Sequence, residues 1–162
     1  GNIPLHYASM RGHDMVVIML LTAGSNVCIV NNINNTPLDY ASMRGHDTIV
    51  AILVTSGADV NVIDRAGNTP LHYACMRRDS NIAKLLLDAG ADVNVIDRSG
   101  NTLLHYACMR RDSNIAKLLL DDGADVNVMN AVNYTPLDYA WKNSNTNNAN
   151  ILVILLNFIL NK

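Results

Sequence analysis

The apolar and polar positions of the chain repeat with a period of 33 residues. One period contains four apolar residues with the spacing of a single helix face: Ile82, Ala83, Leu85 and Leu86. The same period relates leucines, tyrosines and alanines in the segment that precedes this face. They are Leu5, Leu38, Leu71, Leu104 and Leu137, then Tyr7, Tyr40, Tyr73, Tyr106 and Tyr139, then Ala8, Ala41, Ala74, Ala107 and Ala140. The pattern predicts a chain built from one repeated helical unit.

Each unit has the signals of two consecutive helices. In the third unit, Thr69 can cap a first helix that has Pro70 in its first turn and runs to about Arg77. Asp79 or Ser80 can then cap a second helix that carries the apolar face described above.

A turn follows the second helix. Gly90 suits the left-handed residue beyond a helix end, and the segment DRSG at 97–100 has the composition of a turn. A lone helical hairpin cannot bury its apolar face, whereas stacked hairpins share one core. The sequence therefore predicts an all-α solenoid of stacked helix-turn-helix repeats with β-hairpin-like projecting turns. We expect a single domain with five repeats, at about 1–30, 31–63, 64–96, 97–129 and 130–162.

Several short segments resemble ankyrin repeats. They are TPLDYA at 36–41, TPLHYA at 69–74 and GADVNV at 57–62, 90–95 and 123–128. The resemblance covers essentially the whole chain, and its first and last repeats are atypical. Ile3 stands in place of the capping Thr in the first, and the last continues with KNSNTNNAN and lacks GADVN. Because the chain starts within a repeat and ends in an apolar segment, we expect it to be a piece of a longer protein.

Composition and charge narrow the classes of function. The net charge of −2 argues against a generally nucleic-acid-binding surface, and all fourteen acidic residues are Asp. The longest apolar run, 151–156, is far shorter than the roughly 20 residues that span a bilayer. Three cysteines without close spacing favour a reducing compartment. We expect an intracellular protein, with the cytoplasm as the first choice and a secreted effector acting inside a host cell as the second.

No residue pattern indicates catalysis. Histidines recur as His6, His72 and His105, but Asp39 and Asp138 replace them in the other repeats, so a shared chemical role is improbable. The ankyrin resemblance implies that they form hydrogen bonds between a repeat and its turn. No Cys or His spacing suits zinc, and the sequence has neither a Gly-rich phosphate loop nor a GxSxG motif. We predict a non-catalytic protein without cofactor or metal.

Two further sets of residues have a structural and a chemical interpretation. Cys75 and Cys108 are equivalent in neighbouring repeats, whose helix axes stack roughly 8–10 Å apart, and a disulfide needs Cα atoms within ~7 Å. We expect them to stay reduced. Asn61, Asn94 and Asn127 match the position at which some ankyrin repeats are hydroxylated by an asparaginyl hydroxylase. The preferred interpretation is that they cap the turn.

The end of the first helix carries the best candidate site. A Met-Arg pair recurs there, and by the ankyrin resemblance this position faces a concave groove. The groove candidates are Met10, Arg11, Met43, Arg44, Met76, Arg77, Arg78, Met109, Arg110, Arg111 and Lys142. The turn candidates beside them are Arg65, Asn68, Arg98, Asn101 and Tyr134. The alternative is that these arginines are an ordinary solvated face, and repeats three and four are near-duplicates whose shared arginines count as one observation.

The predicted function is recognition of a protein partner, with an acidic surface favoured, through the groove and the turns. Met provides adaptable apolar contact, and Arg provides charge-assisted hydrogen bonds to acidic groups. A second hypothesis makes the chain the recognition arm of a larger enzyme or effector. Nucleic-acid binding is a weaker third hypothesis, since base-stacking aromatic residues are not evident in the groove.

Overall fold

The computed structural model of the chain describes residues 1–142 and 149–160. Within these residues it contains ten α-helices, arranged as five consecutive pairs. They are α1 (Pro4–Arg11), α2 (Asp14–Thr22), α3 (Pro37–Arg44), α4 (Asp47–Thr55), α5 (Pro70–Arg77), α6 (Ser80–Asp88), α7 (Leu103–Arg110), α8 (Ser113–Asp121), α9 (Pro136–Lys142) and α10 (Ala149–Leu160). Most of the segment KNSNTNNAN of the last repeat lies in 143–148, outside the described residues.

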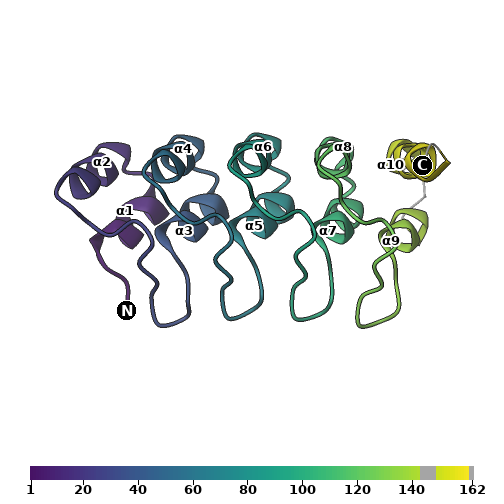
Figure 1. The fold of residues 1–162 in the computed structure, drawn as a ribbon, viewed down its shortest axis with the longest axis horizontal. Coiled ribbons are helices and arrows are strands. Elements are labelled where there is room, and N and C mark those ends of the chain that lie inside the picture. The colour runs from purple at the N-terminus through teal and green to yellow at the C-terminus, as the bar shows by residue number, and fades with distance from the viewer. Residues whose placement is uncertain (143–148, 161–162) are drawn as a thin grey trace.

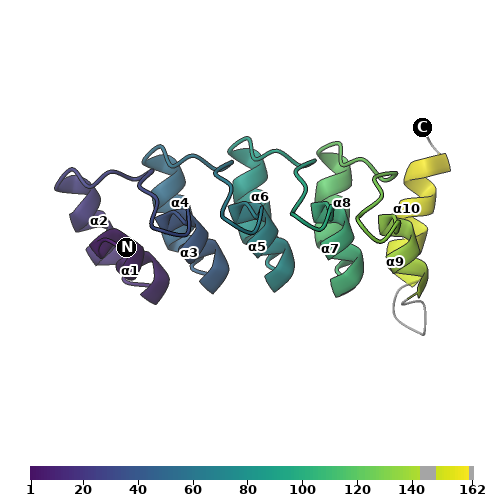
Figure 2. The same ribbon diagram turned by 90° about the horizontal axis from the view of Figure 1, so that it is seen from below.

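The helices form two parallel rows (Figure 1). The odd-numbered helices contact one another in one row, and the even-numbered helices contact one another in the other. The turns project from the odd-numbered row, and the two termini lie at opposite ends of the stack (Figures 1 and 2). This arrangement confirms the predicted all-α repeat solenoid.

Local sequence signals fix where the helices begin. Thr36 and Thr102 accept the main-chain N–H of the third helical residue, which satisfies one of the donors left free at a helix start. Of the two caps considered for α6, Asp79 is the cap: its Oδ1 accepts the N–H of Ile82 at 3.2 Å. Asp112 does the same for Ile115 in α8. The predicted helix starts in the repeat interior are therefore confirmed, although Thr69, the expected cap of α5, makes no side-chain cap hydrogen bond.

The core runs without a break along the stack. Leu5, Leu38, Leu71 and Leu104, one period apart, are fully buried, and so are Ile49, Ile82 and Ile115 from the even-numbered helices. Each repeat thus contributes one layer to a shared apolar interior.

The turns are hairpin-like without forming sheets. In the turn between α4 and α5, Asp64 N–H donates to the Asn68 carbonyl at 2.9 Å, and in the turn between α6 and α7, Asp97 N–H donates to the Asn101 carbonyl at 3.0 Å. One isolated antiparallel bridge, between Ile96 and Thr102, is present in the described part of the chain.

Candidate functional site

The Met-Arg pairs at the ends of the first helices form one column, which we call the helix-end column: Met10-Arg11, Met43-Arg44, Met76-Arg77 and Met109-Arg110. Its four arginines are exposed and its four methionines are half-buried. Each helix ends at its arginine because the next residue takes the left-handed conformation, with φ between 58° and 78°. The structure therefore places these predicted site residues side by side, one repeat apart.

The left-handed position changes identity along the stack. Repeats one and two have Gly12 and Gly45 there, whereas repeats three and four have Arg78 (φ 63°) and Arg111 (φ 58°). A non-glycine residue in this conformation costs about 1–2 kcal/mol. The middle repeats thus carry a second exposed arginine at a backbone position that favours glycine.

Two side chains of this region also hold repeats together. Arg77 donates from Nη1 to the main-chain carbonyl of Met43 at 3.4 Å, and its guanidinium lies over Gly45. His46 stands in the corresponding place one repeat earlier, with Nε2 3.3 Å from the Met10 carbonyl. Arg77 therefore has a structural contact as well as an exposed charge.

In the turns, two of the five predicted residues are free on the surface. Arg65 and Arg98 are exposed, and their main-chain N–H groups donate to Ile33 and Ala66 of the preceding turns, at 3.3 Å each. These bonds tie neighbouring turn tips together and hold both arginines on one edge of the stack.

The other three predicted turn residues have contacts within the stack. Asn68 is buried. Asn101 donates to Asp97 at 3.2 Å and accepts from Asn130 at 2.7 Å. Tyr134 is half-buried, with the Lys142 ammonium 5.2 Å from the centre of its ring. Their contact with a partner stays a prediction, and Asn68 offers little surface for it.

The acidic groups of the turns are occupied. Asp64 accepts the N–H groups of Ala66 and Asn68 on Oδ1, at 2.7 and 2.8 Å, and the Tyr73 hydroxyl on Oδ2. Asp97 makes the equivalent bonds. Partial burial alone would raise the pKa of Asp97, but the hydrogen bonds that it accepts lower it overall. The carboxylates of Asp64 and Asp97 therefore hold the turns together, and they form no ion pair with the adjacent Arg65 and Arg98.

A column of exposed apolar side chains, absent from the predicted site, runs beside these arginines. Val30, Ile63, Ile96 and Met129 stand one period apart, with exposed fractions of 40, 49, 55 and 64%. We call them the turn stripe. Each precedes the tip of its turn, and Ile63 and Ile96 lie two residues before Arg65 and Arg98. Aligning the repeats would have revealed this apolar column in the turn segments.

Comparison with known families gives one result that decides the classification. The family model described as "Ankyrin repeats (3 copies)" matches residues 1–64, 59–130 and 96–159. The chain belongs to the ankyrin-repeat family. No curated protein matches the sequence.

Two of the three histidines in this column of the ankyrin stack have the structural role expected of them, whereas Nε2 of His72 has no hydrogen-bond partner among the described residues. His6 accepts the N–H of Ile3 on Nδ1 and has Nε2 3.0 Å from the Asn35 carbonyl in the next repeat. His105 makes the same pair of contacts with Thr102 and Tyr134. Burial lowers the pKa of both rings, which keeps them neutral near pH 7. The described residues contain no group of three His, Cys, Asp or Glu side chains placed to hold a metal.

The asparagines of the GADVN segments bridge ankyrin repeats. Asn61 donates to the Gly90 carbonyl at 3.2 Å and accepts the Asp92 N–H at 2.9 Å. Asn94 does the same with Gly123 and Asp125. These contacts support the turn-capping interpretation for both residues. Asn127 is exposed, and hydroxylation of any of the three stays untested.

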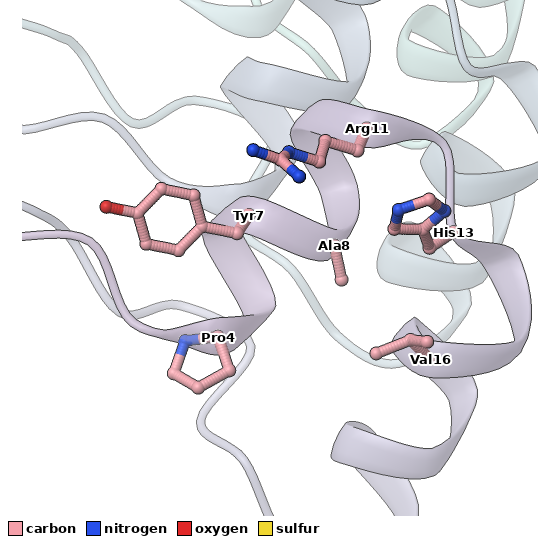
Figure 3. A pocket seen from close by; sticks show the side chains of 6 residues that line it. All are labelled: Pro4, Tyr7, Ala8, Arg11, His13 and Val16. Atoms are coloured by element: carbon pink, nitrogen blue, oxygen red, sulfur yellow. The ribbon is translucent and has the colours of Figure 1, made fainter.

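A hollow of about 430 Å³ lies on the first ankyrin repeat (Figure 3). It is lined by Pro4, Tyr7, Ala8, Arg11, His13 and Val16. The residues equivalent to Pro4 and Val16 in the next two repeats are buried, because a neighbouring repeat packs on that face: they are Pro37 and Pro70, and Ile49 and Ile82. The hollow is thus the stacking face of repeat one, and we assign no ligand to it.

No helix in residues 1–142 or 149–160 is long and apolar enough to cross a bilayer. Cys75 and Cys108 are buried free thiols, and Cys28 is an exposed free thiol.

Proposed function

We propose that this chain recognises a protein partner through the turn stripe together with the exposed arginines of the turns and of the helix-end column, and that it does so without catalysis. Ankyrin repeats are generally protein–protein interaction modules. The observation that supports this particular surface is the turn stripe: four apolar side chains, exposed one per repeat, beside two arginines.

The chemistry of the surface favours a partner with apolar side chains flanked by acidic groups. Exposed apolar side chains gathered in one place on a soluble protein are typical of interaction sites. Arg65 and Arg98 stand next to them, and the carboxylates of Asp64 and Asp97 are already occupied by hydrogen bonds within the turns. An acidic partner would supply the missing counter-charges.

The helix-end column extends the surface towards the first helices. The side chains of Arg44 and Arg110 are exposed and form no hydrogen bond or ion pair with other described residues. The half-buried methionines beside them offer flexible apolar contact. Binding in a concave groove, expected from the family resemblance, stays a prediction.

A comparative pull-down tests the proposal. The parent chain, an Arg65→Glu/Arg98→Glu variant and a Lys84→Glu/Lys117→Glu variant are each immobilised and exposed to the same cell lysate. Both variants reverse two equivalent charges, but Lys84 and Lys117 are exposed on the second helices, away from the turns. Quantitative mass spectrometry then compares the captured proteins.

We expect a protein that the parent and the lysine variant retain and the arginine variant loses. Equal capture by all three chains would show that the turn arginines are not part of the site. Capture that disappears after nuclease treatment would indicate nucleic acid, and it would overturn the proposal.

A further inference from the structure

The third residue of each odd-numbered helix lies at the junction with the next repeat. We call it the junction column: His6, Asp39, His72, His105 and Asp138. At His6 and His105, one ring nitrogen accepts the N–H of the residue before the helix, and the other reaches a carbonyl of the next repeat at 3.0 and 2.9 Å. The equivalent nitrogen of His72 has no hydrogen-bond partner among the described residues. The direct bond is therefore present at two of the three histidine junctions.

Asp39 occupies this position with a carboxyl group. Its Oδ2 takes the place of histidine Nδ1 and accepts the Thr36 N–H at 2.6 Å and the Thr36 hydroxyl at 2.7 Å. Its Oδ1 takes the place of Nε2. That oxygen is buried and has no hydrogen-bond partner in the described chain, and the whole residue has an exposed fraction of 0%.

The group opposite Oδ1 is identified by the repeat. His6 reaches the carbonyl 29 residues later, at Asn35, and His105 reaches the carbonyl 29 residues later, at Tyr134. The equivalent carbonyl for Asp39 belongs to Asn68, which accepts one bond, from Asp64 N–H at 2.9 Å, as Asn35 and Tyr134 accept theirs from Asn31 and Asn130. Two acceptor oxygens cannot bond to each other, but a protonated carboxyl can donate.

We propose that Asp39 is a proton-dependent link between repeats two and three: its neutral carboxyl donates from Oδ1 to the Asn68 carbonyl, and release of the proton to solvent breaks this link and loosens the junction. An ionised Oδ1 would leave a charge in a buried place without a donor, which is unfavourable.

The surroundings of Asp39 agree with a neutral carboxyl. Burial raises the pKa of Asp39 to about 7, against the opposite effect of the two Thr36 hydrogen bonds, and the charge of Asp64 raises it further. The neighbours in its column, His6 on α1 and His72 on α5, are themselves buried, which lowers the pKa of both, that of His72 to about 4. Both histidines are therefore neutral near pH 7 and supply no positive charge to stabilise an ionised Asp39.

The remaining titratable groups near Asp39 supply no positive charge either. Tyr73 on α5 has a pKa raised by burial and by its bond to Asp64, so it stays neutral. Tyr40 follows Asp39 on α3, and its hydroxyl accepts an N–H of the Asn31 side chain at 2.9 Å. Helix α4 carries one titratable residue, Asp47, at its start, next to the end of α3, whereas Asp39 is in the first turn of α3.

The sign of the pH effect follows from the raised pKa. The folded chain holds this proton more tightly than the unfolded chain, so the stabilisation is complete below the unfolded pKa near 4 and is lost as the pH rises through about 7. Buried neutral histidines act in the opposite direction, since they destabilise the fold on acidification. A variant series is needed to separate the two effects.

The test compares urea unfolding of four chains between pH 5 and pH 8.5: the parent, Asp39→Asn, Asp39→His and Asp138→Asn. Asparagine copies the neutral carboxyl, since it accepts with Oδ1 and donates with Nδ2, and histidine copies the neighbouring repeats. Asp138 has the same Thr hydrogen bonds but is exposed, and those bonds lower its pKa, so its variant is the matched control.

In the parent, we expect the unfolding equilibrium constant to rise with pH relative to Asp39→Asn, by up to tenfold per pH unit between the unfolded pKa near 4 and the folded pKa of about 7. Relative to Asp39→His the rise should be steeper, because the introduced histidine acts in the opposite direction. Asp138→Asn should follow the parent. Selective ¹³C labelling of Asp provides a second measurement that needs no stable variant: the Asp39 carboxyl resonance should titrate near neutral pH. Titration of that resonance below pH 5, or parallel pH profiles for the parent and the Asp39 variants, would overturn the proposal.

Discussion

The guanidinium of Arg78 reaches the carboxylate of Asp112, the residue that caps α8 in the next repeat, with 3.4 Å between Nε and Oδ2. Arg78 does this from a left-handed backbone conformation that glycine occupies in repeats one and two. The ion pair therefore offsets part of the backbone strain at Arg78. Arg111 has the same conformation and no ion-pair partner among the described residues.

Arg111→Gly should stabilise the chain by about 1 kcal/mol, because glycine has no Cβ to strain the left-handed conformation. Arg78→Gly gains the same relief but loses the contact with Asp112, so its gain should be smaller. The midpoints of urea unfolding for the two variants measure this difference. A larger gain for Arg78→Gly would mean that the pair with Asp112 adds nothing.

Gly90 and Ala89 provide a second matched comparison. Gly90 has φ 85°, and a Cβ added to it would meet no atom within 4 Å, so only its backbone conformation restricts substitution. Ala89 is exposed, with an ordinary φ of −88°. Gly90→Val should destabilise by about 1–2 kcal/mol or more, and Ala89→Val by within about 0.5 kcal/mol. Equal shifts of the urea midpoint would contradict the assigned helix end.

The three thiols should react at very different rates. Burial raises the pKa of the Cys75 thiol, and raises that of Cys108 to about 12, so neither forms the reactive thiolate near pH 8. Cys28 is exposed. We expect a thiol reagent to label Cys28 rapidly in the folded chain and all three residues in urea. Rapid labelling of Cys108 without urea would show that the stack opens at repeat four.

The sequence was sufficient for the fold because its signals are local and repeated. Thr36, Pro70 and Asp79 each act on the helix that begins beside them. Leu71 is fully buried, and so are its equivalents Leu5, Leu38 and Leu104. Five copies of one pattern leave little choice of architecture once the period is recognised.

The candidate site was harder to predict because it depends on contacts between repeats. The hydrogen bond from the Arg77 side chain to the Met43 carbonyl joins two repeats, and no local sequence pattern indicates it. Asn68 was expected on the surface as a turn residue, yet it is buried where the turn folds back on the helices. Ile63 and Ile96 were missed because each follows a valine within its turn segment and stands out only when the repeats are aligned as a column.

Once a partner has been isolated, two variants should weaken its binding in different ways. Arg44→Glu/Arg110→Glu should slow association, by up to about tenfold at low salt and less at high salt, because charge acts on the encounter. Ile63→Ser/Ile96→Ser should leave association nearly unchanged and speed dissociation, by roughly thirtyfold if the loss of buried apolar area is worth about 2 kcal/mol. Arg77 is kept in both variants, because its contact with the Met43 carbonyl would confuse binding with folding. Binding kinetics at two salt concentrations separate the two effects. If the isoleucine variant binds as the parent does while the arginine variant fails, the helix-end column is part of the site and the turn stripe is an ordinary exposed surface.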